Sequence, residues 1–134
     1  MSNICNTSAL ERYEIATGAT IPHYGLVALD GDGKAIPASD TVSCSVIGVA
    51  EKEVDGKIEV AGGIYAFAND SAAPLTRAHR GKAAFVKDAL TVDSTGGTNK
   101  VVAGIVVDVV DVVDGDVYID ITPAALAAAN ALSK

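Results

Sequence analysis

Apolar and polar residues alternate with a period of two in several stretches of the chain. In residues 57–60 apolar side chains alternate with charged ones, and in residues 117–122 Val and Ile alternate with polar residues. Strands with one buried and one solvated face have this pattern. Residues 101–113 are a nearly continuous apolar run, and their many β-branched side chains disfavour a helix. These patterns predict a β domain over residues 20–122.

Turn signals separate the apolar segments. Asp-Gly pairs occur at residues 55–56 and 114–115 and twice in residues 30–33, and Gly-Gly pairs occur at 62–63 and 96–97. Asp-Gly between two alternating runs predicts a β-hairpin, because both residues tolerate a positive φ. The middle of the chain is therefore expected to consist of short strands joined by hairpins.

Two parts of the chain share an ordered set of residues. The matched positions are His23 and His79, Gly25 and Gly81, and Gly48 and Gly104. Each pair is 56 residues apart, and an insertion of three residues also aligns the Asp-Gly pair of residues 55–56 with that of 114–115. We interpret residues 20–62 and 76–122 as a duplication. Two such units would hide sheet edges that neither could hide alone.

The two ends of the chain differ from this middle region. Residues 1–19 are polar, lack a regular period and are expected to form an N-terminal arm. Residues 123–134 are Ala-rich, and Thr122 followed by Pro123 has the pattern of a helix N-cap and first helical position. The predicted fold class is all-β, a small β-barrel or sandwich from two related hairpin-rich halves, with an extended N-terminal arm and a short C-terminal helix or tail.

Four apolar residues are spaced along the polar arm. They are Ile4, Leu10, Tyr13 and Ile15. Polar segments with spaced apolar anchors commonly order on a partner, by adding a strand or by filling a groove. These four residues are therefore candidate contacts to a capsid or another partner. An alternative stays open, in which residues 8–15 form an ordinary edge strand or helix packed on the same domain.

Composition and charge narrow the classes of function. The 134 residues fit one domain or two very small, closely packed ones. The net charge is −7, and an acidic surface repels phosphate backbones, so no nucleic-acid partner is expected. No apolar segment approaches the length of a membrane span, so no membrane partner is expected either.

No residue pattern of a known catalytic or metal site stands out. The serine motif GxSxG and the glycine-rich phosphate loops do not occur in the sequence. We interpret His23 and His79 as residues of a shared turn rather than metal ligands, and Asp30–Gly33 as a hairpin turn rather than a calcium loop. Cys5 and Cys44 lack metal-ligand spacing, and Cys44, which alternates with Val42 and Val46, is expected to be a buried small hydrophobic residue rather than a nucleophile. We expect a protein that is not an enzyme and has no cofactor and no metal.

Three segments of the middle region carry a family resemblance. They are the opening from Gly25 through Lys34, the "VIGVA" strand at 46–50 that leads into "DGKIEVAGGIYAF" at 55–67, and "AGIVVDVV…GDVYIDI" at 103–121. In composition and order they resemble the small capsid cement or decoration proteins of tailed bacteriophages, small β-barrel or β-tulip-like head proteins. The resemblance extends over residues 20–122.

The resemblance implies a virion structural protein without catalytic residues. Such a protein is made in the host cytoplasm, binds the exterior of the phage head and stabilises contacts between major capsid protein subunits. It implies the major capsid protein as partner and self-association as a dimer or trimer. The residues themselves leave a second class open, a small β-barrel binding module for a carbohydrate or a peptide.

Overall fold

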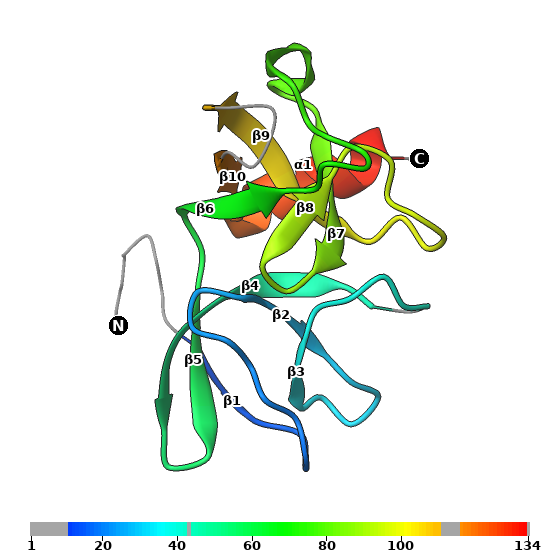
Figure 1. The fold of residues 1–134 in the computed structure, drawn as a ribbon. Coiled ribbons are helices and arrows are strands. Elements are labelled where there is room, and N and C mark those ends of the chain that lie inside the picture. Colours follow the sequence, from blue (N-terminus) through cyan, green and yellow to red (C-terminus); the bar gives the residue numbers. More distant parts are fainter. Residues whose placement is uncertain (1–10, 43, 111–115, 134) are drawn as a thin grey trace.

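The computed structural model describes residues 11–42, 44–110 and 116–133, which form two β lobes and a C-terminal helix (Figure 1). The first lobe contains β1 (Glu11–Glu14), β2 (Leu26–Leu29), β3 (Ala35–Pro37), β4 (Val46–Val54) and β5 (Lys57–Ala61). The second contains β6 (Ile64–Asn69), the 3₁₀-helix η1 (Arg77–His79), β7 (Ala83–Asp88), β8 (Thr91–Asp93), β9 (Val102–Val109) and β10 (Asp116–Asp120), followed by α1 (Pro123–Leu132). The predicted all-β class with a short C-terminal helix is confirmed.

The two lobes are a nearly closed sheet and a closed barrel. The first sheet has the strand order β1-β5-β4-β2-β3, and the second lobe closes as β10-β6-β8-β7-β9. The parallel pair of β6 and β8 closes the barrel of the second lobe. In the first lobe a single parallel bridge joins Ile15 to Ala35, and Ala16 N donates to Ala35 O at 3.0 Å. The segment after β1 thus reaches β3, the opposite edge of its sheet.

Both lobes use one pairing scheme. Equivalent cross-strand pairs are Tyr13↔Ile58 and Phe67↔Val117, Val27↔Gly48 and Ala84↔Gly104, and Ala50↔Val60 and Val106↔Ile119. The bulge at Glu51 in β4 recurs at Val107 in β9, since each is passed over in the pairing with the next strand. The equivalence also includes β1 and β6, which lie outside the two sequence segments that were aligned.

The hydrogen bonds shift the sequence alignment by one residue before β2 and β7. Tyr24 N donates to Ala50 O at 2.7 Å, and Gly81 N donates to Val106 O at 2.8 Å. Tyr24 is therefore the equivalent of Gly81, and both have positive φ, 61° and 82°. The expectation that the two histidines occupy equivalent points is wrong. Between equivalent positions, the connection from β3 to β4 is one residue longer than the connection from β8 to β9. The alignment of Gly25 with Gly81 did not show this difference.

Buried side chains of the described residues gather in two clusters. The smaller lies within the first lobe and includes Val27, Ile58 and Val60, with Tyr13 and Ile15 packed against it. The larger fills the barrel of the second lobe and extends to the side chains of β2 and β4 that point away from the first-lobe interior. The first sheet therefore buries side chains on both faces, one against its own interior and one against the second lobe.

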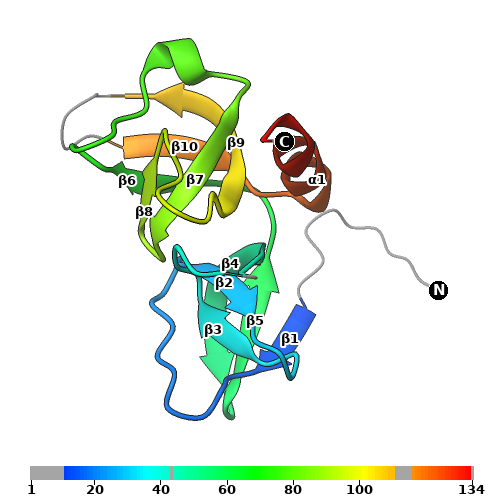
Figure 2. The same ribbon diagram turned by 90° about the vertical axis from the view of Figure 1, so that its right-hand side faces the viewer.

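Local sequence accounts for the connections. Asp55 and Gly56 have φ of 53° and 77°, the two positive values that a two-residue type I′ hairpin needs. Gly62-Gly63 carries the chain from the first lobe to the second, because β5 and β6 lie in different sheets. Thr122 accepts a hydrogen bond from Ala125 N as the cap of α1, as predicted. The helix buries Leu126 and packs mainly on β9, with further contacts to β4 and β7 (Figure 2).

Candidate functional site

The described part of the N-terminal segment belongs to the first lobe. Tyr13 lies on β1 opposite Ile58, and Ile15 follows the strand and bridges to Ala35. Partial burial, together with the nearby Glu11 carboxylate, raises the pKa of the Tyr13 hydroxyl. Residues 11–15 thus have the edge-strand arrangement that the alternative interpretation described. The other two candidate contacts, Ile4 and Leu10, lie outside the described residues.

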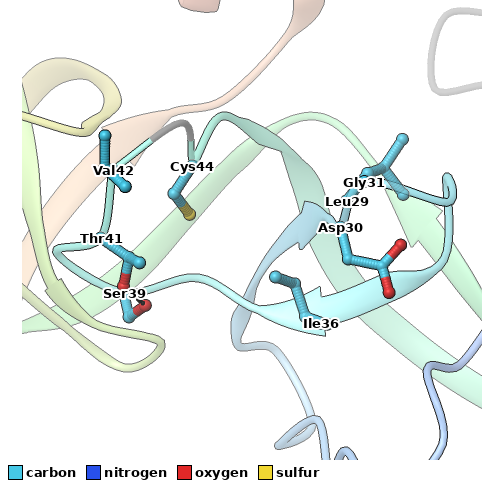
Figure 3. Close-up of a pocket in the computed structure, with 8 residues that line it drawn as sticks. All are labelled: Leu29, Asp30, Gly31, Ile36, Ser39, Thr41, Val42 and Cys44. Carbon is cyan, nitrogen blue, oxygen red and sulfur yellow. Dashed lines mark hydrogen bonds between the residues drawn. The ribbon is translucent and has the colours of Figure 1, made fainter.

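A cavity of about 250 Å³ lies beside the β2–β3 hairpin (Figure 3). Its lining comprises Leu29, Asp30, Gly31, Ile36, Ser39, Thr41, Val42 and Cys44. The Asp30 carboxylate accepts hydrogen bonds from the backbone N–H groups of Lys34 and Asp32, at 2.9 and 2.8 Å, and these bonds lower its pKa. That carboxylate therefore stabilises its own hairpin, as the turn interpretation expects.

Cys44 packs against apolar residues as predicted but is less buried than the sequence pattern indicates. The side chain is a free thiol that is half-buried and packs at the margin of the larger core cluster. Val42, its expected partner in the alternation, is 76% exposed. The reason is that β4 begins only at Val46, so the apparent period of two before it falls in a connection.

An aromatic cluster lies where the lobes meet. The rings of His23 and Tyr24 stack with centroids 3.8 Å apart, and the Tyr24 ring lies 5.8 Å from that of Tyr65. Tyr65, on β6, donates its hydroxyl to Glu51, the bulge residue of β4, at 2.5 Å. Burial and this carboxylate raise the Tyr65 pKa well above its usual value, so the hydroxyl stays a donor. The bond ties the two lobes together.

A cavity of about 360 Å³ adjoins this cluster. It is lined by Ile21, His23, Glu51, Lys52, Glu53 and Ile58. Tyr24 is 47% exposed beside it and has a left-handed backbone conformation where the second lobe has glycine. An exposed aromatic ring next to carboxylates offers a stacking face and hydrogen-bond acceptors to a ligand.

His79 has a local structural role. Thr76 caps η1, and the Thr76 backbone N–H donates to His79 Nδ1 at 2.9 Å. The neighbouring cavity, about 330 Å³, is lined by His79, Lys82 and Phe85 together with residues at the end of α1. Arg77 donates to the carbonyl of Val109 at 3.3 Å. The basic residues around η1 therefore brace the connection from β6 to β7.

Buried polar side chains also serve their own connections. Asn69 donates to Leu75 O and accepts from Leu75 N, at 2.9 and 2.8 Å. The Asp93 carboxylate accepts from Gly96 N at 2.8 Å. Among the residues that the structure describes, no three His, Cys, Asp or Glu side chains gather closely enough to hold a metal ion. These groups offer no evident catalytic constellation.

A loop of the second lobe holds an aspartate of the first. The Asp40 carboxylate accepts from the backbone N–H groups of Thr98 and Asn99, at 3.0 and 2.8 Å, and Asn99 Nδ2 donates to Asp40 O at 3.1 Å. Gly97 lies against this carboxylate with φ of 55°, and a Cβ there would overlap it. The backbone hydrogen bonds lower the pKa of Asp40. The "DSTGGTN" segment thus forms a second tie between the lobes.

Asp40→Asn is expected to lower the melting temperature at pH 7, because an amide cannot accept both backbone hydrogen bonds. Folding lowers the pKa of Asp40, so the ionised carboxylate stabilises the fold at every pH above 3.8, the ordinary pKa of the group. This contribution is lost as the pH falls from there through the folded-state pKa. Melting curves from pH 7 to pH 2.5 should therefore show the two proteins converging in acid. The exposed residue Asp55 provides the control variant Asp55→Asn. If Asp40→Asn changes the melting temperature by the same amount as this control at every pH, the assignment is contradicted.

The outer face of β6 and β10 exposes apolar side chains, which sequence analysis missed. Ile64, Ala66 and Ala68 point outward from β6 while Phe67 and Asn69 point inward, and Tyr118 on β10 is paired with Ala66. The only sequence signal was that "IYAFAN" is apolar on both faces of the strand. Because sheets of this kind normally carry polar residues on the solvated face, the face is a candidate interaction surface.

Two general findings complete the description of the site. No helix within the described residues is long and apolar enough to cross a membrane. Neither the family models, nor the curated proteins, nor the solved structures with which the chain was compared contain a match to it.

Proposed function

We propose that this chain is a virion structural protein, a capsid cement or decoration protein. It would bind the outer surface of a phage head and stabilise contacts between major capsid protein subunits, itself associating as a dimer or trimer. The proposal includes a location on the capsid exterior and a role without catalysis. It starts from the resemblance of residues 20–122 to that family.

The observation that carries the proposal is where the resembling segments fall. "VIGVA" with "DGKIEV" forms most of β4 and β5, and the strands of the third segment form β9 and β10, their equivalents in the second lobe. The resemblance therefore covers the framework of both lobes rather than one loop. The ties between the lobes through Asp40 and Tyr65 support a stiff body, which suits a clamp between neighbouring subunits.

Co-sedimentation tests the proposal. The purified chain is mixed with empty capsids assembled from the major capsid protein encoded nearest its gene, and the pellet is assayed for both proteins. We expect saturable binding in a fixed ratio to capsid subunits, and capsids that withstand higher temperature when decorated. Free major capsid protein in unassembled form is the control. No saturable binding would contradict the proposal.

The second candidate is a binding module for a carbohydrate or a peptide. The observation in its favour is the exposed ring of Tyr24 beside the cavity lined by His23 and Glu51. Saccharides commonly stack on such rings, while carboxylates accept hydrogen bonds from their hydroxyl groups. If the purified chain binds immobilised glycans and does not bind capsids, this function is favoured over the first.

A further inference from the structure

We propose that the outer face of β6 and β10 is the surface that docks on the capsid, and that it takes a subunit surface with an apolar centre and a rim of Lys and Arg. This inference rests on the proposed function. We define the β6–β10 face as Ile64, Ala66, Ala68, Val110 and Tyr118.

The side chains of the β6–β10 face share one side of the sheet. Tyr118 is directly opposite Ala66, so both project from the same side of the sheet. Ile64 and Ala68 are two residues before and after Ala66 on the same side of β6. Ile64 is 59% exposed, Val110 58% and Tyr118 38%. Val110 lies beyond Asp116, which is paired with Ala68, and the Val110 N–H donates to Asp116 O at 3.0 Å.

The first lobe carries charged residues at the equivalent positions, with Arg12 exposed and Glu59 mostly covered. By strand register, Arg12 is equivalent to Ala66, Glu14 to Ala68, and Glu59 to Tyr118. Arg12 and Glu59 form an ion pair at 2.8 Å across the strands. The same fold in the same register thus accepts charged residues at these positions. The apolar residues of the second lobe are therefore not required by the fold, which indicates that they serve a contact.

Charge decides which partner fits. The strands β6, β9 and β10 contain Asp108, Asp116 and Asp120 and neither Lys nor Arg. A second copy docked through the same face would bring these carboxylates together, and the chain already carries a net charge of −7. A partner with Lys or Arg around an apolar patch would instead pair with them. The occupant we infer is accordingly a capsid subunit surface of that kind.

The helix does not compete for this surface. α1 begins directly after β10 but packs mainly on β9, with further contacts to β4 and β7 (Figure 2). Val107 and Val110, toward the other end of β9, are exposed. The covered and the exposed sides of the barrel are therefore different sides, and none of the described residues packs over the β6–β10 face.

The sharpest test moves the first-lobe ion pair onto the second lobe. The double variant Ala66→Arg, Tyr118→Glu places Arg and Glu at the register positions that Arg12 and Glu59 occupy in β1 and β5. Because that pair already exists in this fold, the variant should keep a melting temperature close to that of the unmodified chain. Its affinity for capsids should fall by roughly tenfold or more, as expected when the centre of an interface is lost.

The reverse exchange is the matched control. Arg12→Ala with Glu59→Tyr gives the first lobe the apolar pair and should leave capsid affinity unchanged. Ala68→Glu, which copies Glu14, is a second variant in case the double variant does not fold, and it too should lower affinity. Binding of the unmodified chain should weaken in about 1 M salt, since the screening length there is roughly 3 Å and the rim ion pairs lose most of their attraction.

The outcomes separate the two proposals. If the unmodified chain does not bind capsids, the proposed function and this inference both fail. If it binds, and the folded double variant binds equally well, only the docking face is wrong. Loss of self-association by the double variant with full capsid binding would show that a second copy occupies the face, which also overturns the inference.

Discussion

Replacing Gly104 with alanine is expected to lower the free energy of unfolding by roughly 3 kcal/mol or more, because backbone strain and overpacking act together. Gly104 has φ of 156°, a conformation that residues with a Cβ rarely adopt. A Cβ at this position would overlap the carbonyl oxygen of Asp120 and lie 2.7 Å from Ile119 Cγ2. Both contacts come from β10, whose pairing with β9 leaves little room to move.

The same prediction applies to Gly48, the equivalent of Gly104 in the first lobe. It has φ of 157°, and a Cβ there would lie 2.6 Å from Val60 Cγ1 and 2.8 Å from Ala61 O. Urea unfolding of both alanine variants should show large losses. The controls are Gly33→Ala, where φ is 78° but the space is open, and Gly31→Ala, where nothing lies within 4 Å. If Gly104→Ala unfolds at the midpoint of Gly31→Ala, the close approach has no energetic consequence.

Gly48 and Gly104 are examples of features of the fold that the sequence could predict. Their recurrence in Val-rich runs and the Asp-Gly pair at 55–56 are local signals, because a positive φ restricts the residue type directly. The equivalence of β1 and β6 left no such signal. Their sequences, "ERYE" and "IYAFAN", share only an inward aromatic residue, Tyr13 or Phe67, and it is the pairing with β5 and β10 that makes them equivalent.

The candidate surfaces were harder to predict for a related reason. Alternation shows which residues of a strand share a face but not whether an apolar face is covered, so the sequence "IYAFAN" does not indicate which of its two faces is exposed. The apparent alternation around Cys44 failed because it preceded the strand. The contrast of Ala66 with Arg12 depends on a register between distant strands, which is fixed by tertiary pairing and not by local pattern.

Deleting residues 2–16 is expected to lower the melting temperature by about 10 °C or more. The deletion removes β1, leaves β5 as an open edge and takes away the Ile15–Ala35 bridge that joins the two edges of the sheet. Tyr13 and Ile15 also pack on the first-lobe cluster, and loss of such contacts costs about 3 kcal/mol, or roughly 10 °C for a domain of this size. Differential scanning calorimetry measures the change directly.

Deletion of residues 2–10 is the comparison, because it leaves β1 and both of its packed side chains in place. Co-sedimentation with capsids then divides the two interpretations of the N-terminal segment. If residues 11–15 serve the first lobe, deletion of residues 2–16 lowers the melting temperature. In that case the full-length variant Tyr13→Phe keeps its melting temperature and its capsid binding. If the longer deletion instead melts normally and loses capsid binding, β1 contributes little to the lobe and the segment is a partner-binding arm, with Tyr13 and Ile15 among its contacts. The edge-strand pairing and the packing of both side chains favour the first result.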